Sequence, residues 1–345
     1  MNLAIIFGGQ SYEHEISIVS AVTVGRVLET SPLYIFLDSD NRLYEIPSNK
    51  MSSKLFKSGE YRKEKKLNFT FNGFTTEGFF KKELKGFTVL NLIHGGQGED
   101  GTIPALLEFY KIPYIGPRKD ASTISYNKHL TKIFADSIGI KTVDYETLYI
   151  GDERKLHKLS YPVIVKPLSL GSSIGVKVAN SDDEFQYALD VAFEYDSEVI
   201  IEKYIDGVKE YNLAGIETDK FILSIVEEPQ KGDDILDFNT KYLDFSRDSR
   251  VVEANIDNEI RLLIQDSFKK IYSPIFRGSL IRCDFFVIDD EVYLNEINSV
   301  PGSMANYLFN DFESTLKELS ENLPNVGNIS VKYEYIDTIQ KAKGK

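Results

Sequence analysis

The chain has 345 residues, of which 42% are hydrophobic and 27% charged, and its formal net charge is −13. This length predicts two or three compact units rather than one core, and the acidic balance excludes a general nucleic-acid-binding surface. The start, MNLAIIFGGQ, lacks the basic segment of a signal peptide, and no stretch approaches the roughly 20 apolar residues of a membrane span. The only cysteine, Cys283, excludes an intrachain disulfide and a cysteine metal cluster, and favours a reducing cytoplasm.

Strands that end in glycine-rich loops and lead into helices are predicted for the first third of the chain. NLAIIFGG reads as a strand, and SIVSAVTVGRVL has the apolar spacing of a helix. FTVLNLIHGGQGEDG repeats the pattern, with its helix near 103–110. The alternation predicts an α/β fold with a parallel sheet and ligands beyond the strand ends, where Glu15 and His94 lie. The charged region 50–85 shows no clear period.

The remainder of the chain predicts strands of antiparallel character. A helix is expected over 126–137 and another over 182–193, with two strands and a Ser/Gly loop in YPVIVKPLSLGSSIGVKVA and a strand in EVIIEKYI. EYNLAGIE, FILSIVEE, IRCDFFVI and VYLNEIN follow as antiparallel strands, and IRLLIQDSFKKIYSPI as an amphipathic helix. The polar stretch KGDDILDFNTKYLDFSRDSR is too long for an ordinary turn and predicts a functional lid.

The segment DFFVIDDEVYLNEIN predicts a hairpin of two apolar strands with polar outer ends. A three-residue turn at 289–291 would place Asp284 opposite Glu296, with Asn298 on the same face, whereas a two-residue turn would oppose Asp284 to Asn295. Facing carboxylates repel unless a cation lies between them, and their burial is costly unless they are paired or bind a metal. Their oxygen ligands suit Mg²⁺ rather than zinc. The alternative is a solvated strand end with ordinary surface charge.

A second candidate site begins at Lys166, which follows the apolar run PVIV. Lys166 would be either an edge residue of the strand or a phosphate ligand. The loop GSSIG at 171–175 can direct several backbone N–H groups at an anion, although it lacks the Lys-Ser/Thr ending of a full phosphate loop. Together with an oxygen-ligand metal site, these features indicate a nucleoside triphosphate. Cys283 is expected to pack in the core.

Eight motifs together resemble the D-alanine–D-alanine ligase family of the ATP-grasp superfamily. They are FGGQSYEHEIS, HGGQGEDG, LLEFYKIPYIGP, VKPLSLGSSIG, IEKYIDG, KYLDF, RCDFF and NEINSVPG, and they span nearly the whole chain. The resemblance implies a three-domain fold: an N-terminal parallel α/β domain at 1–116, a central ATP-grasp subdomain at 117–202, and a C-terminal ATP-grasp subdomain at 203–345 with a lid at 230–250. ATP would lie between the antiparallel-containing sheets of the last two.

The resemblance further implies that ATP drives the joining of two D-alanines through an acyl phosphate, for the synthesis of peptidoglycan precursors. The first D-alanine carboxylate attacks the γ-phosphate, and the amine of the second attacks the resulting carbonyl. Two Mg²⁺ ions, which Mn²⁺ can replace, would assist the phosphoryl transfer. A cytoplasmic homodimer that binds D-alanine and ATP, but no nucleic acid and no membrane, is expected on the same basis.

Roles for single residues also come from the resemblance. Metal ligation is implied for Asp284, Glu296 and Asn298, with Glu296 bridging both ions. ATP binding is implied for Lys128, Lys166, Ser173, Glu202, Lys203, Ile205 and Glu210. Catalysis is implied for Glu15, Ser172, Tyr242, Arg282 and the N–H of Gly302, the first three as a hydrogen-bonded triad and the last two as an oxyanion hole. Substrate contacts are implied for His94, Lys241, Ser303 and Tyr307.

The sequence departs from the family pattern after Gly302. The family has a Thr/Ser-rich run where this chain has SMANYLF, and Tyr307 falls at the position of a serine that helps to bind the second carboxylate. Its hydroxyl could substitute, as could Ser303 or Asn306, but a longer side chain changes the pocket. The contacts to the second substrate therefore stay open at this point.

Three alternatives remain beside dipeptide synthesis. A ligase that takes D-lactate as its second substrate would often carry histidine where this chain has Tyr242. Another ATP-grasp carboxylate–amine ligase, such as one of glutathione-synthetase type, would lack the motifs HEIS and HGGQGEDG. A non-catalytic nucleotide-binding regulator would be expected to have lost metal ligands or the oxyanion arginine, and this sequence retains all of them.

Overall fold

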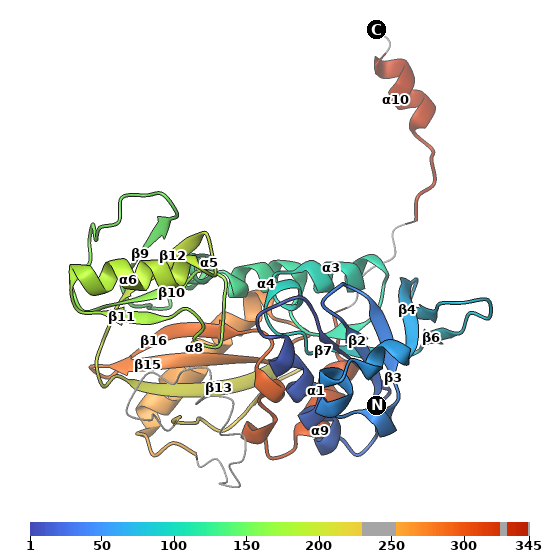
Figure 1. The fold of residues 1–345 in the computed structure, drawn as a ribbon, viewed down its shortest axis with the longest axis horizontal. Helices are drawn as coiled ribbons and strands as arrows, with labels where there is room; N and C mark the ends of the chain where they lie inside the picture. The colour runs from blue at the N-terminus through green and yellow to red at the C-terminus, as the bar shows by residue number, and fades with distance from the viewer. Residues whose placement is uncertain (230–252, 325–329, 344–345) are drawn as a thin grey trace.

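The protein is described from a computed structural model, which covers residues 1–229, 253–324 and 330–343 (Figure 1). Lys241, Tyr242 and the predicted lid at 230–250 lie outside the described residues. Three sheets organise the described chain, one of eight strands and two of four. No helix in the described ranges is long and apolar enough to cross a membrane.

The eight-stranded sheet occupies the N-terminal part, in the order β6-β5-β4-β3-β2-β1-β7-β8. Its strands are β1 Leu3–Gly8, β2 Leu33–Leu37, β3 Leu43–Ile46, β4 Lys65–Thr70, β5 Gly73–Thr76, β6 Glu83–Lys85, β7 Thr88–Asn91 and β8 Tyr114–Ile115. The predicted parallel pairing is confirmed for β2-β1-β7-β8, whereas β2 to β6 pair antiparallel. The short connections from β4 to β5 and from β5 to β6 permit only antiparallel pairing, whereas β3 and β4 are joined by a longer connection that contains three short helices. The region 50–85, which showed no clear period, thus adds three strands to the edge of the sheet.

Helices connect and cover these strands. They are η1 Ser48–Lys50, α2 Ser53–Lys57, η2 Glu60–Lys63, η3 Gly96–Gly98, α1 His14–Val27 and α3 Thr102–Phe109. The passage from β1 to α1 requires glycine, because Gly8 has a φ of +96° and a Cβ there would lie 2.2 Å from the carbonyl oxygen of Leu37. Buried residues of α1, such as Ala21 and Val24, join the same core as Phe7 of β1.

The second sheet has the order β11-β10-β12-β9. Its elements are α4 Lys119–Tyr126, α5 Lys128–Ser137, β9 Tyr145–Tyr149, β10 Val163–Pro167, β11 Lys177–Ala179, α6 Asp182–Phe193 and β12 Glu198–Lys203. The helix expected over roughly 126–137 is confirmed as α5, which begins two residues later, at Lys128, because the separate helix α4 ends at Tyr126. Asn127 has extended backbone angles, and its side chain caps α5 by accepting the N–H of Leu130 at 2.9 Å. The helix predicted over 182–193 is confirmed.

The third sheet has the order β14-β13-β15-β16, and all its pairs are antiparallel, as predicted. Its elements and those that follow are β13 Lys209–Glu217, β14 Phe221–Leu223, α8 Asn258–Ile275, β15 Ile281–Ile288, β16 Glu291–Asn298, η4 Gly302–Leu308, α9 Phe312–Glu321 and α10 Ile336–Lys343. The strand predicted for FILSIVEE is limited to its first three residues. Cys283 is fully buried in the core beneath this sheet, which confirms its packing role.

The β15–β16 hairpin combines both registers that the sequence left open. Asp289 and Asp290 have φ of +49° and +61°, and Ile288 pairs with Glu291, so the turn has two residues rather than three. A β-bulge then leaves one extra residue, Asn295, on β16, and from there outward Asp284 stands opposite Glu296. The structure thus has the two-residue turn of one alternative and the pairing of Asp284 with Glu296 of the other.

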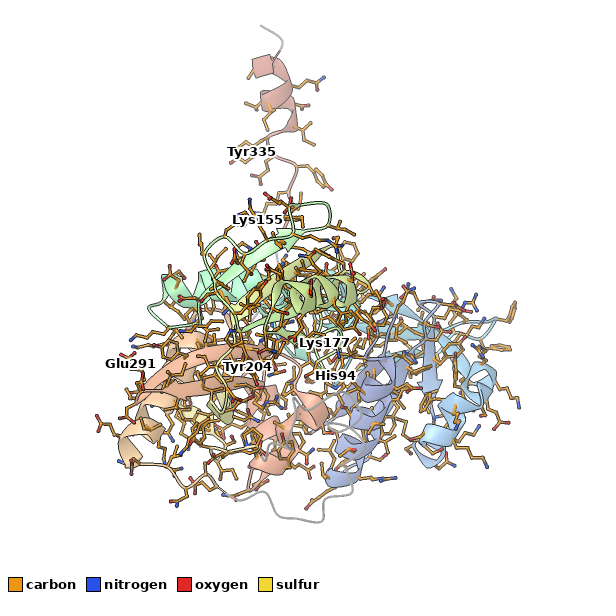
Figure 2. The ribbon with its side chains drawn as sticks, turned by 60° about the vertical axis from the view of Figure 1, so that its left-hand side comes forward. His94, Lys155, Lys177, Tyr204, Glu291 and Tyr335 are labelled. Carbon is orange, nitrogen blue, oxygen red and sulfur yellow. The ribbon has the colours of Figure 1, made fainter. Side chains whose placement is uncertain are left out.

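The hydrophobic core joins the two ends of the chain. Met304, Leu308 and Leu316, which belong to η4 and α9, pack with the residues between α1 and the eight-stranded sheet. By contrast, α10 stands away from the rest of the described chain, and Tyr335 at its start is 69% exposed (Figures 1 and 2). The C-terminal part of the third-sheet region thus packs directly on the N-terminal part, which fixes the loop after Gly302 against α1.

Candidate active site

A cavity lies between the second and third sheets, bounded by β10 and β12 on one side and β16 on the other. Its lining residues are Glu99, Ser125, Tyr126, Lys128, Thr131, Lys132, Lys166, Leu170, Gly171, Glu202, Asn295, Glu296, Ile297 and Asn298. Five residues predicted to contact ATP or metal therefore line one cavity, although they are dispersed over the sequence. Lysines lie on one side of it, and the carboxylate and amide of β16 lie on the other.

Glu202, near the end of β12, is held between two lysines. Its Oε1 lies 2.6 Å from Nζ of Lys132 and its Oε2 lies 2.5 Å from Nζ of Lys166, and only 4% of its side chain is exposed. Burial opposes ionisation, but the attraction of both ammonium groups outweighs it and lowers the pKa of Glu202 to about 2. Glu202 is therefore ionised, and Lys132 and Lys166 stabilise its negative charge in this buried position. Sequence reasoning missed Lys132, because a lysine within a helical pattern normally faces solvent.

Lys128 and Lys166 also contribute positive charge to one side of the cavity. Lys128, at the start of α5, donates from Nζ to the carbonyl oxygen of Leu170 in the loop after β10. Burial lowers the pKa of Lys128, and the nearby charge of Lys166 adds to that effect. Burial would also lower the pKa of Lys166, but attraction from Glu202, Glu296 and Glu210 raises it. Lys166 is consequently the more firmly charged of the two.

The predicted metal ligands meet on one face of the β15–β16 hairpin. Asn298 Nδ2 lies 3.0 Å from Asp284 Oδ2 and 3.4 Å from Glu296 Oε1. Arg282 donates to both oxygens of Asp284, from Nε at 2.7 Å and from a terminal nitrogen at 2.8 Å. Burial would lower the pKa of Arg282, but Asp284 raises it well above the usual value. Two carboxylates and an amide within mutual contact form an oxygen donor set that fits Mg²⁺ once the amide turns its oxygen inward.

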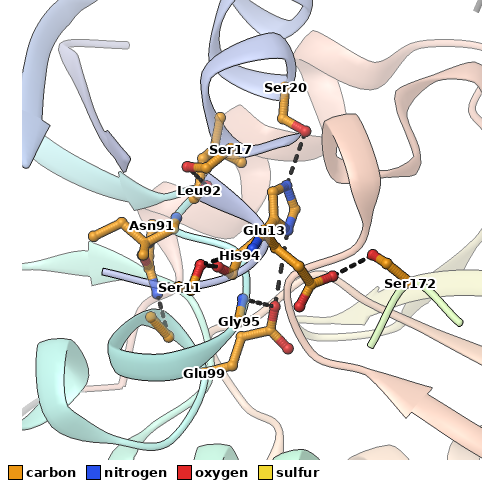
Figure 3. A network of polar contacts seen from close by, with 12 residues as sticks. Ser11, Glu13, Ser17, Ser20, Asn91, Leu92, His94, Gly95, Glu99 and Ser172 are labelled. Carbon is orange, nitrogen blue, oxygen red and sulfur yellow. Dashed lines mark hydrogen bonds and ion pairs between the residues drawn. The ribbon is translucent and has the colours of Figure 1, made fainter. Parts of the chain in front are cut away.

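The structure corrects the predicted triad at its first member. Glu13, not Glu15, reaches Ser172, whose hydroxyl donates to Oε1 of Glu13 (Figure 3). Glu13 directly precedes α1 and is 7% exposed, whereas Glu15 in the first turn is exposed. The physical reason is helical geometry: residues two apart at a helix start point in different directions, so only one of the two can face the loop.

Glu13 occupies a confined position beside two glycines. A Cβ at Gly95 would lie 2.6 Å from its Oε2, and one at Gly171 would lie 3.0 Å from its Oε1. Burial raises the pKa of Glu13, repulsion from Glu99 adds to the rise, and the Ser172 hydrogen bond partly opposes both. The glycines of HGGQGEDG and GSSIG therefore leave room for this carboxylate between two loops.

The loop GSSIG carries two consecutive left-handed residues, since Ser172 and Ser173 each have a φ of +56°. Such a conformation is costly for residues with a Cβ and marks positions that the surroundings determine. Ser172 is held by Glu13, and Ser173 is half-buried in the same loop. The loop thus lies between the cavity and the N-terminal part of the chain.

His94, which follows β7 and is labelled in Figure 2, belongs to a polar network beside α1 (Figure 3). Its Nε2 lies 2.8 Å from Oγ of Ser20 on α1, and its Nδ1 lies 3.8 Å from Oε1 of Glu99. The hydroxyl of Ser11 donates to the carbonyl oxygen of His94 at 2.6 Å. Ser20 and Glu99 thus hold the ring and Ser11 holds the backbone of His94, which is 4% exposed.

The segment after Gly302 adopts an unusual backbone. Ser303, Met304 and Ala305 have φ of +49°, +54° and +48°, and all three are buried. The N–H of Ser303 donates to Oγ of Ser20 at 3.1 Å, and Asn306 Nδ2 donates to the carbonyl oxygen of Ser303 at 2.7 Å. A residue of α1, which is distant in the sequence, thus helps to hold the left-handed turn at Ser303–Ala305.

Tyr307 follows this turn and faces Arg282. Although 43% of the residue is exposed, burial of its hydroxyl end raises the pKa of Tyr307 to about 12, against the lowering effect of Arg282.

Three other residues predicted to contact ATP lie close to Glu202 in the sequence. Lys203 is the last residue of β12 and is exposed. Ile205 follows β12, Glu210 lies on β13, and both are half-buried. The structure brings these three to the same end of the two sheets as Glu202.

Comparison with known proteins supports one family over nearly the whole chain. Residues 2–117 match the model of the D-ala D-ala ligase N-terminus, and residues 134–314 match that of the D-ala D-ala ligase C-terminus. D-alanine–D-alanine ligases of Sulfurovum sp. and Campylobacter jejuni subsp. doylei are 57% and 51% identical over 347 residues, with 100% of both chains covered in each case.

A solved structure extends the similarity to three dimensions. The D-alanine–D-alanine ligase of Helicobacter pylori is 46% identical, with a TM-score of 0.85, and the match covers 95% of this chain and 100% of that one. The predicted α/β ATP-grasp fold is confirmed by this match. From the two family models, the full-length relatives and the shared architecture, we conclude that this chain belongs to the D-alanine–D-alanine ligase family.

Proposed function

We propose that this member of the family joins two D-alanines to D-alanyl-D-alanine, with ATP bound in the cavity between the second and third sheets. The observation that carries the proposal is the arrangement of that cavity. Lys128 and Lys166 on one side face Glu296 and Asn298 on the other. Cations suit the phosphates of a nucleotide, while an oxygen donor set on the opposite wall suits the metal that accompanies them.

The metal would be held by Asp284, Glu296 and Asn298. Bound there, Mg²⁺ supplies neutralisation of phosphate charge, and Mn²⁺ has a similar preference for oxygen ligands. The remaining requirement of phosphoryl transfer is positioning. Lys128 and Lys166 orient the phosphates, and the left-handed GSSIG loop, which contains Ser173, directs backbone groups toward the same cavity.

Glu202, Lys203 and Ile205 follow one another at the end of β12 and its exit, and Glu210 lies on the next strand. This placement suits the nucleoside half of ATP, with its adenine along the connection between the two sheets and its ribose toward Glu210. The exposed end of the connection leaves room for an uncharged base, and the buried lysines stand where the phosphates would follow.

The first D-alanine would bind where the N-terminal part of the chain meets the GSSIG loop. Glu13 would offer a carboxylate to the ammonium of the first D-alanine, the role that the family resemblance implies for Glu15, and His94 would help to position it. The first substrate's carboxylate then attacks the γ-phosphate, the bond from the γ-phosphorus to the bridging oxygen breaks, and ADP leaves as the acyl phosphate forms. Attack by the second amine follows, and phosphate leaves with its bonding electron pair.

Arg282 and the N–H of Gly302 are suited to stabilise the charge that develops on the carbonyl oxygen during that second attack. Arg282 is already oriented by its two hydrogen bonds to Asp284. Tyr307, beside Arg282, and Ser303 would contact the carboxylate of the second D-alanine. Their positions would replace the Thr/Ser-rich run that this sequence lacks.

Three broader properties belong to the same proposal. Boundaries near Pro117 and Glu202 divide the chain into 1–116, 117–202 and 203–345, a division that leaves each sheet in one part except for Lys203, the last residue of β12. The protein would act in the cytoplasm, where its substrates and ATP are available, and as a homodimer. Its product would enter peptidoglycan precursor synthesis.

The experiment that tests the proposal measures phosphate release from ATP and Mg²⁺ with D-alanine, with L-alanine, and with D-alanine plus D-lactate. We expect release, with dipeptide as the product, for D-alanine alone, and none for L-alanine. Equal release with and without an amino acid would contradict the ligase assignment. A mixed product that contains D-lactate would move the assignment to a depsipeptide ligase.

A further inference from the structure

Lys132 is a buried lysine for which the reaction described above has no use. It lies on the inner side of α5 and only 3% of its side chain is exposed. Its Nζ lies 2.6 Å from Oε1 of Glu202, donates to the carbonyl oxygen of Val143 at 3.2 Å, and sits 5.1 Å from the ring centre of Tyr145. The carboxylate, the carbonyl and the aromatic ring each stabilise the charge of this ammonium, and together they compensate for its burial.

The other partner of Glu202 is Lys166, and the two lysines are not equivalent. The side chain of Lys166 is 16% exposed, compared with 3% for Lys132, and Lys166 is also attracted by Glu296 and Glu210. Each lysine takes a different oxygen of the same carboxylate. Lys166 can therefore turn toward the cavity without disturbing the contact between Lys132 and Glu202.

The contribution of Lys132 follows from the balance of charge around Glu202. A carboxylate this deeply buried is strongly destabilising when it has no counter-ion. With Lys132 present, Lys166 can leave Glu202 and still leave a neutral pair behind. Without Lys132, the same movement would strand the charge of Glu202, so Lys166 would stay on the carboxylate.

We propose that Lys132 is a positioning residue that neutralises Glu202 and thereby frees Lys166 to bind the phosphates of the nucleotide. The proposal rests on the proposed function, since it assumes that ATP occupies this cavity. It predicts that Lys132 acts only through Glu202, and only on ligands that carry phosphates. Neither effect is expected if Lys132 merely stabilises the fold.

The test measures the binding of two probes by calorimetry: a non-hydrolysable ATP analogue with Mg²⁺, and adenosine. Lys132→Met should weaken binding of the analogue by about tenfold or more, the effect of losing one charged contact to phosphate. Adenosine binding should stay within about twofold of wild type, because it offers no phosphate to Lys166. The matched control is Lys141→Met, which removes an exposed lysine that lies 2.5 Å from Glu291, and it should change neither value.

A double substitution separates positioning from stability. In Lys132→Met/Glu202→Gln no buried charge is left to hold Lys166, so binding of the analogue should equal that of Glu202→Gln alone. The double variant also remains informative if the single Lys132→Met variant does not fold, because it leaves neither the carboxylate of Glu202 nor the ammonium of Lys132 buried without a counter-ion.

Two outcomes would overturn the proposal. One is analogue binding within about twofold of wild type in folded Lys132→Met. The other is binding that differs by more than about threefold between Glu202→Gln and the double variant. Neither result depends on dipeptide synthesis. A wild-type protein that binds the analogue but makes no dipeptide would contradict the proposed function while leaving this inference standing.

Discussion

The hydroxyl of Ser20 accepts a hydrogen bond from the N–H of Ser303 at 3.1 Å and lies 2.8 Å from Nε2 of His94. One side chain on α1 thus touches both the ring placed for the first substrate and the backbone next to Gly302. The turn at Ser303–Ala305 has left-handed angles, which cost on the order of 1–3 kcal/mol per residue without support from the surroundings. Ser20 supplies part of that support from a different region of the chain.

Ser20→Ala should therefore reduce kcat/KM for D-alanine by about tenfold or more, because both substrate positions lose a fixed neighbour. Binding of a non-hydrolysable ATP analogue should change little, since the nucleotide cavity lies elsewhere. Steady-state kinetics and calorimetry give the two values. The matched control is Ser320→Ala, in which the lost hydroxyl contacts only the carbonyl oxygen of Lys317 within its own helix. An unchanged kcat/KM in Ser20→Ala would show that the turn at Ser303–Ala305 does not depend on Ser20 for its role.

The two glutamates at the start of α1 should differ sharply. Glu13→Gln should lower kcat by about 10² or more, because a buried carboxylate that contacts Ser172 and is placed to meet an ammonium loses its charge. Glu15→Gln should behave as wild type, since Glu15 is exposed. The measurement is dipeptide formation by each purified variant. The opposite ranking would restore the triad that the sequence alone suggested.

Glu296→Gln should nearly abolish turnover while the fold survives. Removing one carboxylate of the Asp284/Glu296 pair leaves a divalent ion under-coordinated at the transferring phosphate, whereas loss of repulsion between facing carboxylates does not harm the hairpin. The check is turnover against Mg²⁺ concentration, with circular dichroism as the control for folding. Turnover close to that of wild type at saturating Mg²⁺ would rule out Glu296 as a ligand.

Arg282→Ala should lower kcat by about 10² or more, with a smaller effect on KM for ATP, because a donor aimed at developing oxyanion charge acts mainly in the transition state. Arg282→Lys should recover only part of the rate, since a lysine cannot reproduce two parallel contacts to Asp284. If the change were confined to KM for ATP, Arg282 would have to be reassigned as a nucleotide contact.

The pH dependence of stability should carry the signature of Glu202. Its pKa in the folded protein is about 2, below the ordinary value of 4.5, so its ionisation stabilises the folded state above the ordinary value. That contribution is lost as the pH falls from 4.5 toward 2. Urea unfolding over this range should show a steeper loss of stability in wild type than in Glu202→Gln. Parallel curves for the two proteins would assign acid sensitivity to other carboxylates.

Much of the candidate site could be predicted from sequence because its residues stand at the ends of periodic elements. The apolar runs around Asp284 and Glu296 identify two strands, and the strand before Lys166 ends in a glycine-rich loop. Local patterns of this kind indicate which residues share an element and a face. They are also what the family resemblance consists of.

The patterns failed where a position depends on contacts between distant segments. Whether Glu13 or Glu15 faces Ser172 depends on where α1 begins against the GSSIG loop. Lys132 has the sequence appearance of an exposed helical lysine and becomes buried only because β12 brings Glu202 to it. The hairpin has a two-residue turn, and the bulge at Asn295 that restores the facing carboxylates left no sign in the alternation.

The family, most of the elements and the residue types at the site could be predicted from sequence, because apolar periodicity, glycines and motif spacing are properties of short segments. Which of two glutamates is buried, which lysine neutralises Glu202, and how Ser20 supports the turn after Gly302 depend on contacts made in the folded protein. These are pairings across large separations in the chain. Their energies arise from burial and charge once the three sheets have come together, and no local pattern records them.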